Sequence, residues 1–272
     1  MEEKIPLSVV IVTKNAQDLI EDCLKSVFGW VQEIVVVDDM STDDTVKYVR
    51  KYTDKIFTRK WVREGAHRNF AYSQASCKYI LSLDSDERVT PELKTEIINL
   101  FKEGPKYEGY NIPHRNFIAD YWLRYGGWYP NAKLKMFAQD KFKYEEEAEY
   151  HPRAFLDGKA CTLKSDIIHY AYKDFTNLYA KLNHQTDFEA KKWVRDARKM
   201  SFGICAGKIW SRFIKFYFVK KGYKDGFIGF VMALASGLYQ FMTYTKYWEI
   251  KRIERNANTD NGRGRPSRQP LR

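Results

Sequence analysis

The sequence of 272 residues is poor in cysteine and has no cysteine spacing that would suit zinc. Its four cysteines, Cys23, Cys77, Cys161 and Cys205, lie far apart. Scattered cysteines of this kind indicate reduced, mostly buried thiols rather than disulfide bridges or a structural metal. The first residues are acidic where a secretory signal would be positively charged. We therefore expect a cytoplasmic protein.

Acidic residues are scarce in one part of the chain. Between 191 and 225, eleven lysines and arginines stand against two aspartates. Such a basic stretch fits either nucleic acid or an anionic membrane surface. The bulky apolar side chains between the charges favour a peripheral membrane contact and argue against nucleic acid. These side chains are Trp210, Phe213, Ile214, Phe216, Tyr217 and Phe218.

Charge is absent from the next twenty residues, 226–245, which are about as long as a membrane span. Several glycines and tyrosines, together with Ser236 and Gln240, keep the hydropathy of this run modest. We therefore expect a helix that packs on the domain or lies in the membrane interface, rather than a span. Residues 256–272 have nothing to bury, so a disordered tail is predicted there.

The first hundred residues alternate apolar runs with amphipathic helical patterns. The runs at 7–13, 33–37 and 79–83 are typical of parallel strands covered on both faces. Thr90 and Pro91 are predicted to start a helix after the last of these runs. Strands and helices that alternate with short links indicate an α/β fold with a mostly parallel sheet flanked by helices.

Two of the apolar runs end abruptly in carboxylates. Asp38 and Asp39 follow one run, and Asp84 and Asp86 follow another. The carboxyl ends of parallel strands form the ligand crevice of an open α/β sheet. Two carboxylates one residue apart can share a hard divalent cation that also holds a diphosphate. A single pair of aspartates of this kind commonly caps a helix. Two such strand ends in one chain favour a ligand site.

Four segments around these residues resemble family 2 glycosyltransferases with a GT-A fold, in order and in spacing. They are SVVIVTKN at 8–15, VDDMSTDDT at 37–45, GAHRN at 65–69 and LDSDE at 83–87. Similarities at 169–172, 217–230 and 246–249 resemble the bacterial branch that includes the lipopolysaccharide-core β-1,4-glucosyltransferases. The resemblance covers about 5–255.

The resemblance implies an inverting, metal-dependent transferase with a GT-A (Rossmann-like) fold. It would move a sugar from a nucleotide-sugar donor, a UDP-sugar, to a glycan or lipid-linked acceptor. The process would be the synthesis of cell-envelope polysaccharide or lipopolysaccharide, at the inner face of the membrane. The cofactor would be Mg²⁺ or Mn²⁺, bound by Asp84 and Asp86.

The donor site implied by the resemblance lies at the ends of the predicted strands. The nucleobase and the ribose of the donor would contact the residues after the first two strands. Arg68 would bind the donor phosphates. The implied residues are Thr13, Asn15, Asp38, Asp39, Arg68, Asp84 and Ser85. The competing interpretations are that Asp38 caps a turn and that Arg68 is a solvated helix residue.

Inverting transfer also needs a general base for the acceptor hydroxyl. Relatives carry a His-Glu pair after the middle strands, whereas this chain has His151 followed by Pro152. Glu149 is the first candidate for the base, and Glu147 and His151 are alternatives. The alternative is that these residues form only a solvated acidic loop. The protein would then lack an effective base and would be a catalytically impaired nucleotide-sugar-binding protein. A phosphotransfer receiver domain, suggested by 37–39, is disfavoured by the long aromatic remainder.

The predicted organisation has four parts. Residues 1–110 form the nucleotide-sugar-binding half of the GT-A domain, and 111–173 form the acceptor-side half, with an aromatic loop at 115–130. Residues 174–255 form a helical, membrane-proximal extension, because the pattern there is mainly helical. The tail is 256–272.

Overall fold

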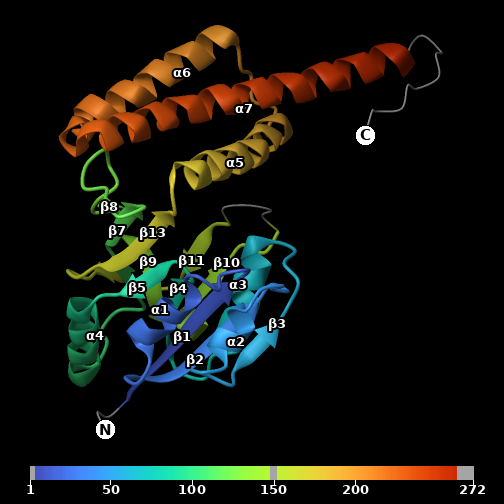
Figure 1. The fold of residues 1–272 in the computed structure, drawn as a ribbon. Helices are drawn as coiled ribbons and strands as arrows, with labels where there is room; N and C mark the ends of the chain where they lie inside the picture. Colours follow the sequence, from blue (N-terminus) through green and yellow to red (C-terminus); the bar gives the residue numbers. More distant parts are fainter. Residues whose placement is uncertain (1–3, 148–151, 262–272) are drawn as a thin grey trace. The chain divides into compact units, whose positions relative to one another are not determined.

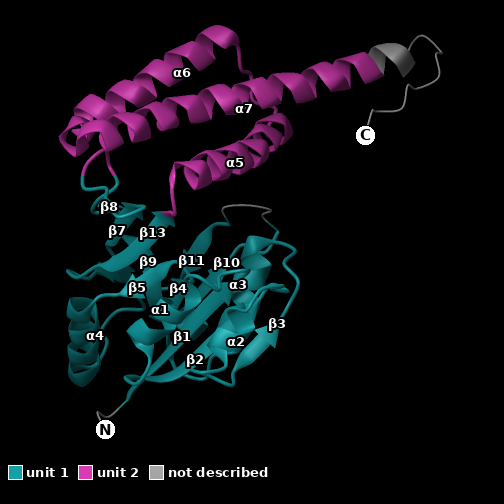
Figure 2. Cartoon of the chain, in the orientation of Figure 1, with its two compact units in different colours: residues 1–124, 128–171 teal, residues 125–127, 172–272 magenta. Residues whose placement is uncertain are grey.

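The computed structural model describes residues 4–147 and 152–261 and divides the chain into two compact units. Unit 1 comprises 1–124 and 128–171, and unit 2 comprises 125–127 and 172–272 (Figure 2). Unit 1 is an α/β structure, whereas unit 2 is built from long helices (Figure 1). The predicted sheet flanked by helices, with a helical extension after it, is therefore confirmed.

A seven-stranded sheet forms the centre of unit 1, in the order β12-β6-β9-β4-β1-β2-β3. Its strands are β1 (Ile5–Thr13), β2 (Val31–Asp38), β3 (Ile56–Thr58), β4 (Tyr79–Asp84), β6 (Gly109–Ile112), β9 (Lys133–Ala138) and β12 (Ala160–Thr162). Only β9 runs antiparallel to its neighbours β4 and β6. The register pairs Thr13 with Asp38 and Val12 with Asp84, so the carboxyl ends of β1, β2 and β4 share one edge.

Helices cover both faces of this sheet. They are α1 (Ile20–Val27), α2 (Thr45–Val49), α3 (Glu64–Ser73) and α4 (Pro91–Glu103). Along β1, Leu7 and Val9 belong to the core that includes α1 and α4, whereas Val10 packs in the core that includes α3. Successive side chains of a strand point to opposite faces, which explains the unbroken apolar run. The Thr90 hydroxyl accepts a hydrogen bond from the Leu93 N–H, which confirms the predicted cap of α4.

A four-stranded sheet of order β5-β13-β7-β8 lies beside the first. It contains β5 (Glu87–Val89), β7 (His114–Ile118), β8 (Tyr121–Trp122) and β13 (Ile167–Tyr172), and a separate hairpin joins β10 (Phe142–Tyr144) to β11 (Ala154–Leu156). The sequence predicts one strand over 107–114, but the structure has two, β6 and β7, with Pro113 between them. Proline has no N–H to donate, so the chain leaves one sheet there and enters the other.

Unit 2 consists of α5 (Phe175–Arg195), α6 (Phe202–Ile214) and α7 (Gly226–Asn261), with the short turns η2 (Lys215–Val219) and η3 (Gly222–Asp225) before α7. Both α5 and α6 pack against α7. A Cβ on Gly229 would lie 1.9 Å from the carbonyl oxygen of Gly222, so this turn requires glycine. Helix α7 continues to Asn261, past residue 255, where the helical extension is predicted to end.

Candidate nucleotide-sugar site

Asp39 lies just beyond the carboxyl end of β2 and is almost fully buried. Its carboxylate accepts hydrogen bonds from the Trp61 N–H at 2.7 Å and from Lys14 Nζ at 2.8 Å. Burial by itself would raise the pKa of Asp39, but the bonds from Lys14 and Trp61 outweigh it and lower this pKa. Asp39 is therefore a buried acceptor that stays ionised at neutral pH.

Polar atoms without partners surround Asp39. The Asp39 N–H donates to the carbonyl oxygen of Thr13 at 2.8 Å, and the ring of His67 packs on Trp61 at 4.8 Å. Within the described part of the chain, the Thr13 hydroxyl and both ring nitrogens of His67 are buried and make no hydrogen bond. Buried polar groups are normally paired, so this cluster is suited to a ligand that offers hydrogen bonds.

Asp38 and Asn15 shape the two loops beside Asp39. The Asp38 carboxylate accepts hydrogen bonds from the backbone N–H of Ser41, at 2.9 Å, and from its hydroxyl. Asn15 Oδ1 accepts from the Thr42 N–H at 2.8 Å, and the Asn15 N–H donates to the Ser41 hydroxyl at 2.8 Å. Together these bonds tie the loop after β1 to the loop after β2, and Asp38 caps the turn.

Asp84, at the end of β4, is held by two cations. Arg68 Nη2 lies 2.9 Å from Asp84 Oδ1, and Lys135 Nζ lies 3.1 Å from Asp84 Oδ2. Burial would raise the pKa of Asp84, but Arg68 and Lys135 hold it well below its usual range. The Arg68 side chain is only 15% exposed, so it is not a solvated helix residue.

Glu87, His114 and Lys135 extend this cluster into the interior, although the sequence analysis gives them no role. Lys135 Nζ lies 2.7 Å from Glu87 Oε2, and Glu87 Oε1 lies 3.1 Å from His114 Nε2. Glu87 Oε2 also accepts the Asp84 N–H at 2.9 Å. The available signal was Lys135 between the apolar residues Leu134 and Met136 of β9, because charged residues are almost never buried without partners.

Asp86 has a different neighbour from Asp84. His169 Nε2 lies 3.7 Å from Asp86 Oδ2, and the Tyr170 N–H donates to the Asp86 carbonyl oxygen at 2.9 Å. Strands β5 and β13 pair antiparallel and place His169 opposite Glu87. Ser85, between the two aspartates, accepts a hydrogen bond from Arg88 at its carbonyl oxygen. His169 belongs to the segment 169–172, whose resemblance to the family implied no role for it.

The donor atoms at this edge fit a divalent cation. Asp86 offers carboxylate oxygens and His169 offers an imidazole nitrogen, both common metal ligands. Among the described residues, no group of three or more His, Cys, Asp or Glu side chains could enclose a metal alone. Mg²⁺ is usually held by one or two carboxylates together with substrate phosphates, so a cation that arrives with a diphosphate suits this pair.

The segment that leads to the candidate bases is attached to α3. A Cβ on Gly65 would lie 1.9 Å from the Glu145 carbonyl oxygen, so only glycine allows this approach. Asn69 binds the backbone of Tyr144 through both ends of its amide, at 2.9 Å each. The segment 65–69 of α3, which includes Arg68, therefore holds the start of the acidic loop at 144–147 against this helix.

Only one of the three candidate bases lies in the described part of the chain. The Glu147 side chain is 83% exposed and forms an ion pair with Arg63. Glu149 and His151 lie outside the described residues.

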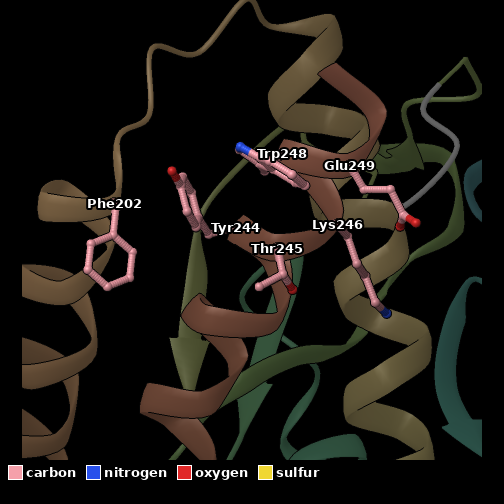
Figure 3. Close-up of a pocket in the computed structure, with 6 residues that line it drawn as sticks. All are labelled: Phe202, Tyr244, Thr245, Lys246, Trp248 and Glu249. Carbon is pink, nitrogen blue, oxygen red and sulfur yellow. The ribbon is translucent and has the colours of Figure 1, made fainter. Parts of the chain in front are cut away.

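A separate pocket of about 550 Å³ lies in unit 2. Its walls are Phe202 of α6 and five residues of α7, with the aromatic rings of Phe202, Tyr244 and Trp248 around the opening (Figure 3). Lys246 points toward α5, where it bonds to Asn183 and pairs with Asp187 at 2.7 Å. No residue predicted for the donor site lines this pocket.

The fold of unit 1 is that of a GT-A glycosyltransferase, with carboxylates and basic residues gathered at the carboxyl edge of the parallel strands. The model of glycosyl transferase family 2 matches residues 8–158, which is more than half of the chain. The chain belongs to this family and is a transferase, as the resemblance implies.

Several known proteins are similar over nearly the whole length. An uncharacterized glycosyltransferase of Rickettsia conorii is 28% identical over 94% of this chain and 94% of its own length. The lipopolysaccharide core biosynthesis glycosyltransferase LpsC of Rhizobium meliloti is 22% identical over 96% of this chain and 98% of its own. The mannosyltransferase PcManGT of Pyrobaculum calidifontis, solved with GDP-Man and Mn²⁺, aligns with a TM-score of 0.53 at 13% identity over 91% of this chain and 88% of its own.

Proposed function

We propose that this protein transfers a sugar from a nucleotide-sugar donor, a UDP-sugar, to a glycan or lipid-linked acceptor in the synthesis of cell-envelope lipopolysaccharide. The observation that carries the proposal is the row of groups along one sheet edge. Asp39 with its unsatisfied neighbours suits a base and ribose, and the pair of Arg68 and Asp84 lies at the end of the nearby strand β4. The similarity to LpsC supports the acceptor class.

The donor diphosphate would lie beside Arg68 and Lys135. Both cations already face the carboxylate of Asp84, so they are held in position before a ligand arrives. Preorganised cations bind phosphate oxygens without the cost of ordering long side chains at the moment of binding.

The cation, Mg²⁺ or Mn²⁺, would be held by Asp86 and His169 and would neutralise charge on the leaving diphosphate. Asp84 is predicted as a second ligand, but its two oxygens face Arg68 and Lys135. We therefore propose that Asp84 orients these two residues, while Asp86 and His169 supply the ligands. PcManGT was solved in complex with GDP-Man and Mn²⁺, which is in keeping with such a site in this fold.

We propose that the reaction is inverting. The proposed general base is Glu149, with Glu147 and His151 as alternatives. The attachment of 144–146 to α3 supports a position for this loop close to Arg68. The high exposure of Glu147 and its ion pair with Arg63 make it the weaker of the two glutamates.

The inner face of the cell membrane is the proposed place of the reaction, and unit 2 carries the features that support it. Helix α7 exposes an apolar side chain every three or four residues along most of one face, each between 37% and 71% exposed. These residues are Phe227, Phe230, Leu234, Leu238, Phe241 and Trp248. We call them the α7 stripe.

The part of the chain that contains most of the α7 stripe is also rich in basic residues. From 200 to 245 the sequence has six lysines and arginines and one acid, Asp225. Asp225 is buried and accepts the Tyr125 N–H at 2.8 Å, so it is not part of the exposed surface. A surface of this charge and hydropathy suits an anionic lipid bilayer, whereas two copies of it would repel each other.

Helix α7 is also long and apolar enough to cross a membrane by length and composition alone. About two fifths of its most apolar window is buried within the protein, where α5 and α6 pack on it. We therefore favour a helix that lies in the interface over one that spans.

A screen of nucleotide-sugars by thermal shift, with and without Mn²⁺, tests the proposed donor. A ligand that binds only the folded state at a hundredfold excess over its Kd adds about 2.7 kcal/mol of stability. We expect a UDP-sugar to raise the Tm, and to raise it further with Mn²⁺. The absence of a shift with every nucleotide-sugar would contradict the proposal, and stabilisation without turnover would favour the impaired binding protein.

A further inference from the structure

Asn116 lies on β7, next to β13, and is 2% exposed. Its side chain reaches His169, one of the two residues proposed above to hold the cation. We propose that Asn116 is a positioning residue, which fixes the tautomer of His169 so that the lone pair of Nε2 faces Asp86. This inference rests on the proposed metal site and adds the residue that prepares it.

The orientation of the Asn116 amide follows from its partners. Asn116 Nδ2 donates to the carbonyl oxygen of Trp128 at 2.8 Å and to that of His114 at 3.2 Å. Both partners can only accept, so the NH₂ group must face them. Rotating the amide by half a turn would set an oxygen against two carbonyl oxygens and lose both bonds. The opposite end, Oδ1, is therefore directed at His169.

The tautomer of His169 follows from this orientation. Asn116 Oδ1 lies 2.7 Å from His169 Nδ1, and an amide oxygen can only accept a hydrogen bond. Nδ1 must therefore carry the proton, which leaves Nε2 of the neutral ring with its lone pair free to bind a metal. The separation of 3.7 Å between Nε2 and Asp86 Oδ2 is too long for a hydrogen bond. The two atoms are thus two electron-pair donors at one edge of the site.

Burial makes this arrangement specific to Asn116. Because Asn116 is almost fully enclosed, water has little access with which to replace its oxygen if the side chain is removed. Residues that orient a metal-binding histidine in this way typically change metal affinity by 10- to 100-fold when they are mutated. The break between β6 and β7 at Pro113 is what brings Asn116 into the sheet that contains His169.

The test compares Asn116→Leu, which removes both ends of the amide, with Asn116→Asp, which keeps an acceptor for His169 but loses the donor to the carbonyl oxygens of His114 and Trp128. In the metal-free protein, ¹⁵N and ¹³C NMR above the titration range of histidine reports the tautomer of each ring. The chain has five histidines, and His169→Gln identifies the signal of His169. We expect the Nδ1–H form in the wild type and in Asn116→Asp, and loss of this preference in Asn116→Leu.

The second measurement is the affinity for Mn²⁺ in the presence of UDP, by EPR. We expect Asn116→Leu to raise the Kd by about 10- to 100-fold and Asn116→Asp, which still accepts from His169 Nδ1, to raise it less. Phe117→Leu is the matched control, because Phe117 is the next residue on β7 and packs on Tyr170 instead. Its Kd should stay at the wild-type value while its Tm reports any general damage to β7.

Two results would overturn the role of Asn116: an Nε2–H tautomer of His169 in the wild type, or an unchanged Kd for Mn²⁺ in a folded Asn116→Leu protein. A wild-type protein that binds no Mn²⁺ with UDP present would instead overturn the proposed metal site, and the role of Asn116 with it.

Discussion

Asp84 and Asp86 stand one residue apart in the sequence, yet their carboxylates have different partners. Asp84 pairs with Arg68 and Lys135, which come from α3 and β9. Asp86 faces His169, which comes from β13. One carboxylate thus pairs with Arg68 and Lys135, whereas the other lies 3.7 Å from the imidazole of His169. The two should respond differently to substitution.

Removing Asp86 is expected to affect metal binding and not folding. In Asp86→Ala, Mn²⁺-dependent affinity for a nucleoside diphosphate should be lost, while the Tm stays close to the wild-type value. Isothermal titration with and without Mn²⁺ measures the first effect, and thermal unfolding measures the second. Unchanged Mn²⁺-dependent affinity would rule out Asp86 as a ligand.

Removing Asp84 should instead lower the stability of the fold. Asp84→Ala removes the carboxylate that Arg68 and Lys135 share, and losing one partner of a buried ion pair is costly even though Lys135 keeps Glu87. Since about a third of the Asp84 side chain is exposed, the expected loss is about 1–3 kcal/mol in the free energy of unfolding. Denaturant titration provides the measurement, and a stability equal to that of the wild type would contradict the assignment.

The general base gives a further prediction at this scale. Glu149→Gln keeps the shape of the side chain and removes its basicity, so kcat should fall by about 100-fold or more while donor affinity hardly changes. Glu147→Gln is the parallel variant, and its kcat should fall less, because Glu147 is exposed and paired with Arg63. Near-normal turnover in Glu149→Gln would transfer the role to Glu147 or His151.

At the scale of elements, one buried cluster joins three strands from different parts of the chain. Glu87 belongs to β5, His114 to β7 and Lys135 to β9, and Glu87 binds the other two. Burial would raise the pKa of Glu87, but Lys135 and His114 lower it to about 2. The cluster connects the seven-stranded sheet to the four-stranded sheet directly beneath Asp84 and Asp86.

The lowered pKa of Glu87 predicts how stability depends on pH. A carboxyl group with a folded-state pKa below its unfolded value stabilises the fold above the unfolded pKa, near 4.3. This contribution is lost as the pH falls through about 2. Between these values the free energy of unfolding should drop by roughly 2–4 kcal/mol on account of Glu87.

Glu87→Gln tests this prediction, since glutamine keeps the shape but does not titrate. Denaturant titrations across the acid range should show a flatter fall in stability for the variant, from a lower starting value at neutral pH. An acid limb as steep as that of the wild type would mean that other groups carry the effect.

At the scale of the whole molecule, we propose donor binding for unit 1 and membrane contact for unit 2. Unit 1 holds the donor site, and unit 2 carries the exposed α7 stripe and the basic residues near it. We expect the full-length protein to bind anionic vesicles at low salt. The binding should weaken with salt, because surface charges are screened within about 10 Å at 0.1 M.

Two sets of substitutions separate the sources of vesicle binding. Charge reversal at Lys220, Lys221 and Lys224 should remove most of the salt-sensitive part, and serine at Phe227, Leu234 and Phe241 should remove the salt-resistant part. Flotation with anionic and neutral vesicles measures both. A protein that ignores anionic vesicles at low salt would refute the interfacial model, and failure of alkaline carbonate to extract it from membranes would indicate a span.

The sequence by itself determined the features that depend on neighbouring residues. The apolar runs of β1, β2 and β4, the cap at Thr90 and the carboxylates after the strands are local patterns, and the motifs around them identified the family. The same patterns predicted the α/β fold, because alternating strands and helices with short links can form few other arrangements.

Only the tertiary structure decided which distant residues meet. Lys135 joins Asp84 from 51 positions away and Asn116 meets His169 across 53, separations at which no local pattern carries a signal. The exposed face of α7 belongs to the same class, because the run at 226–245 has no charged residue that would mark one side as exposed. Packing against α5 and α6 buries one side of that helix and leaves the α7 stripe in contact with solvent.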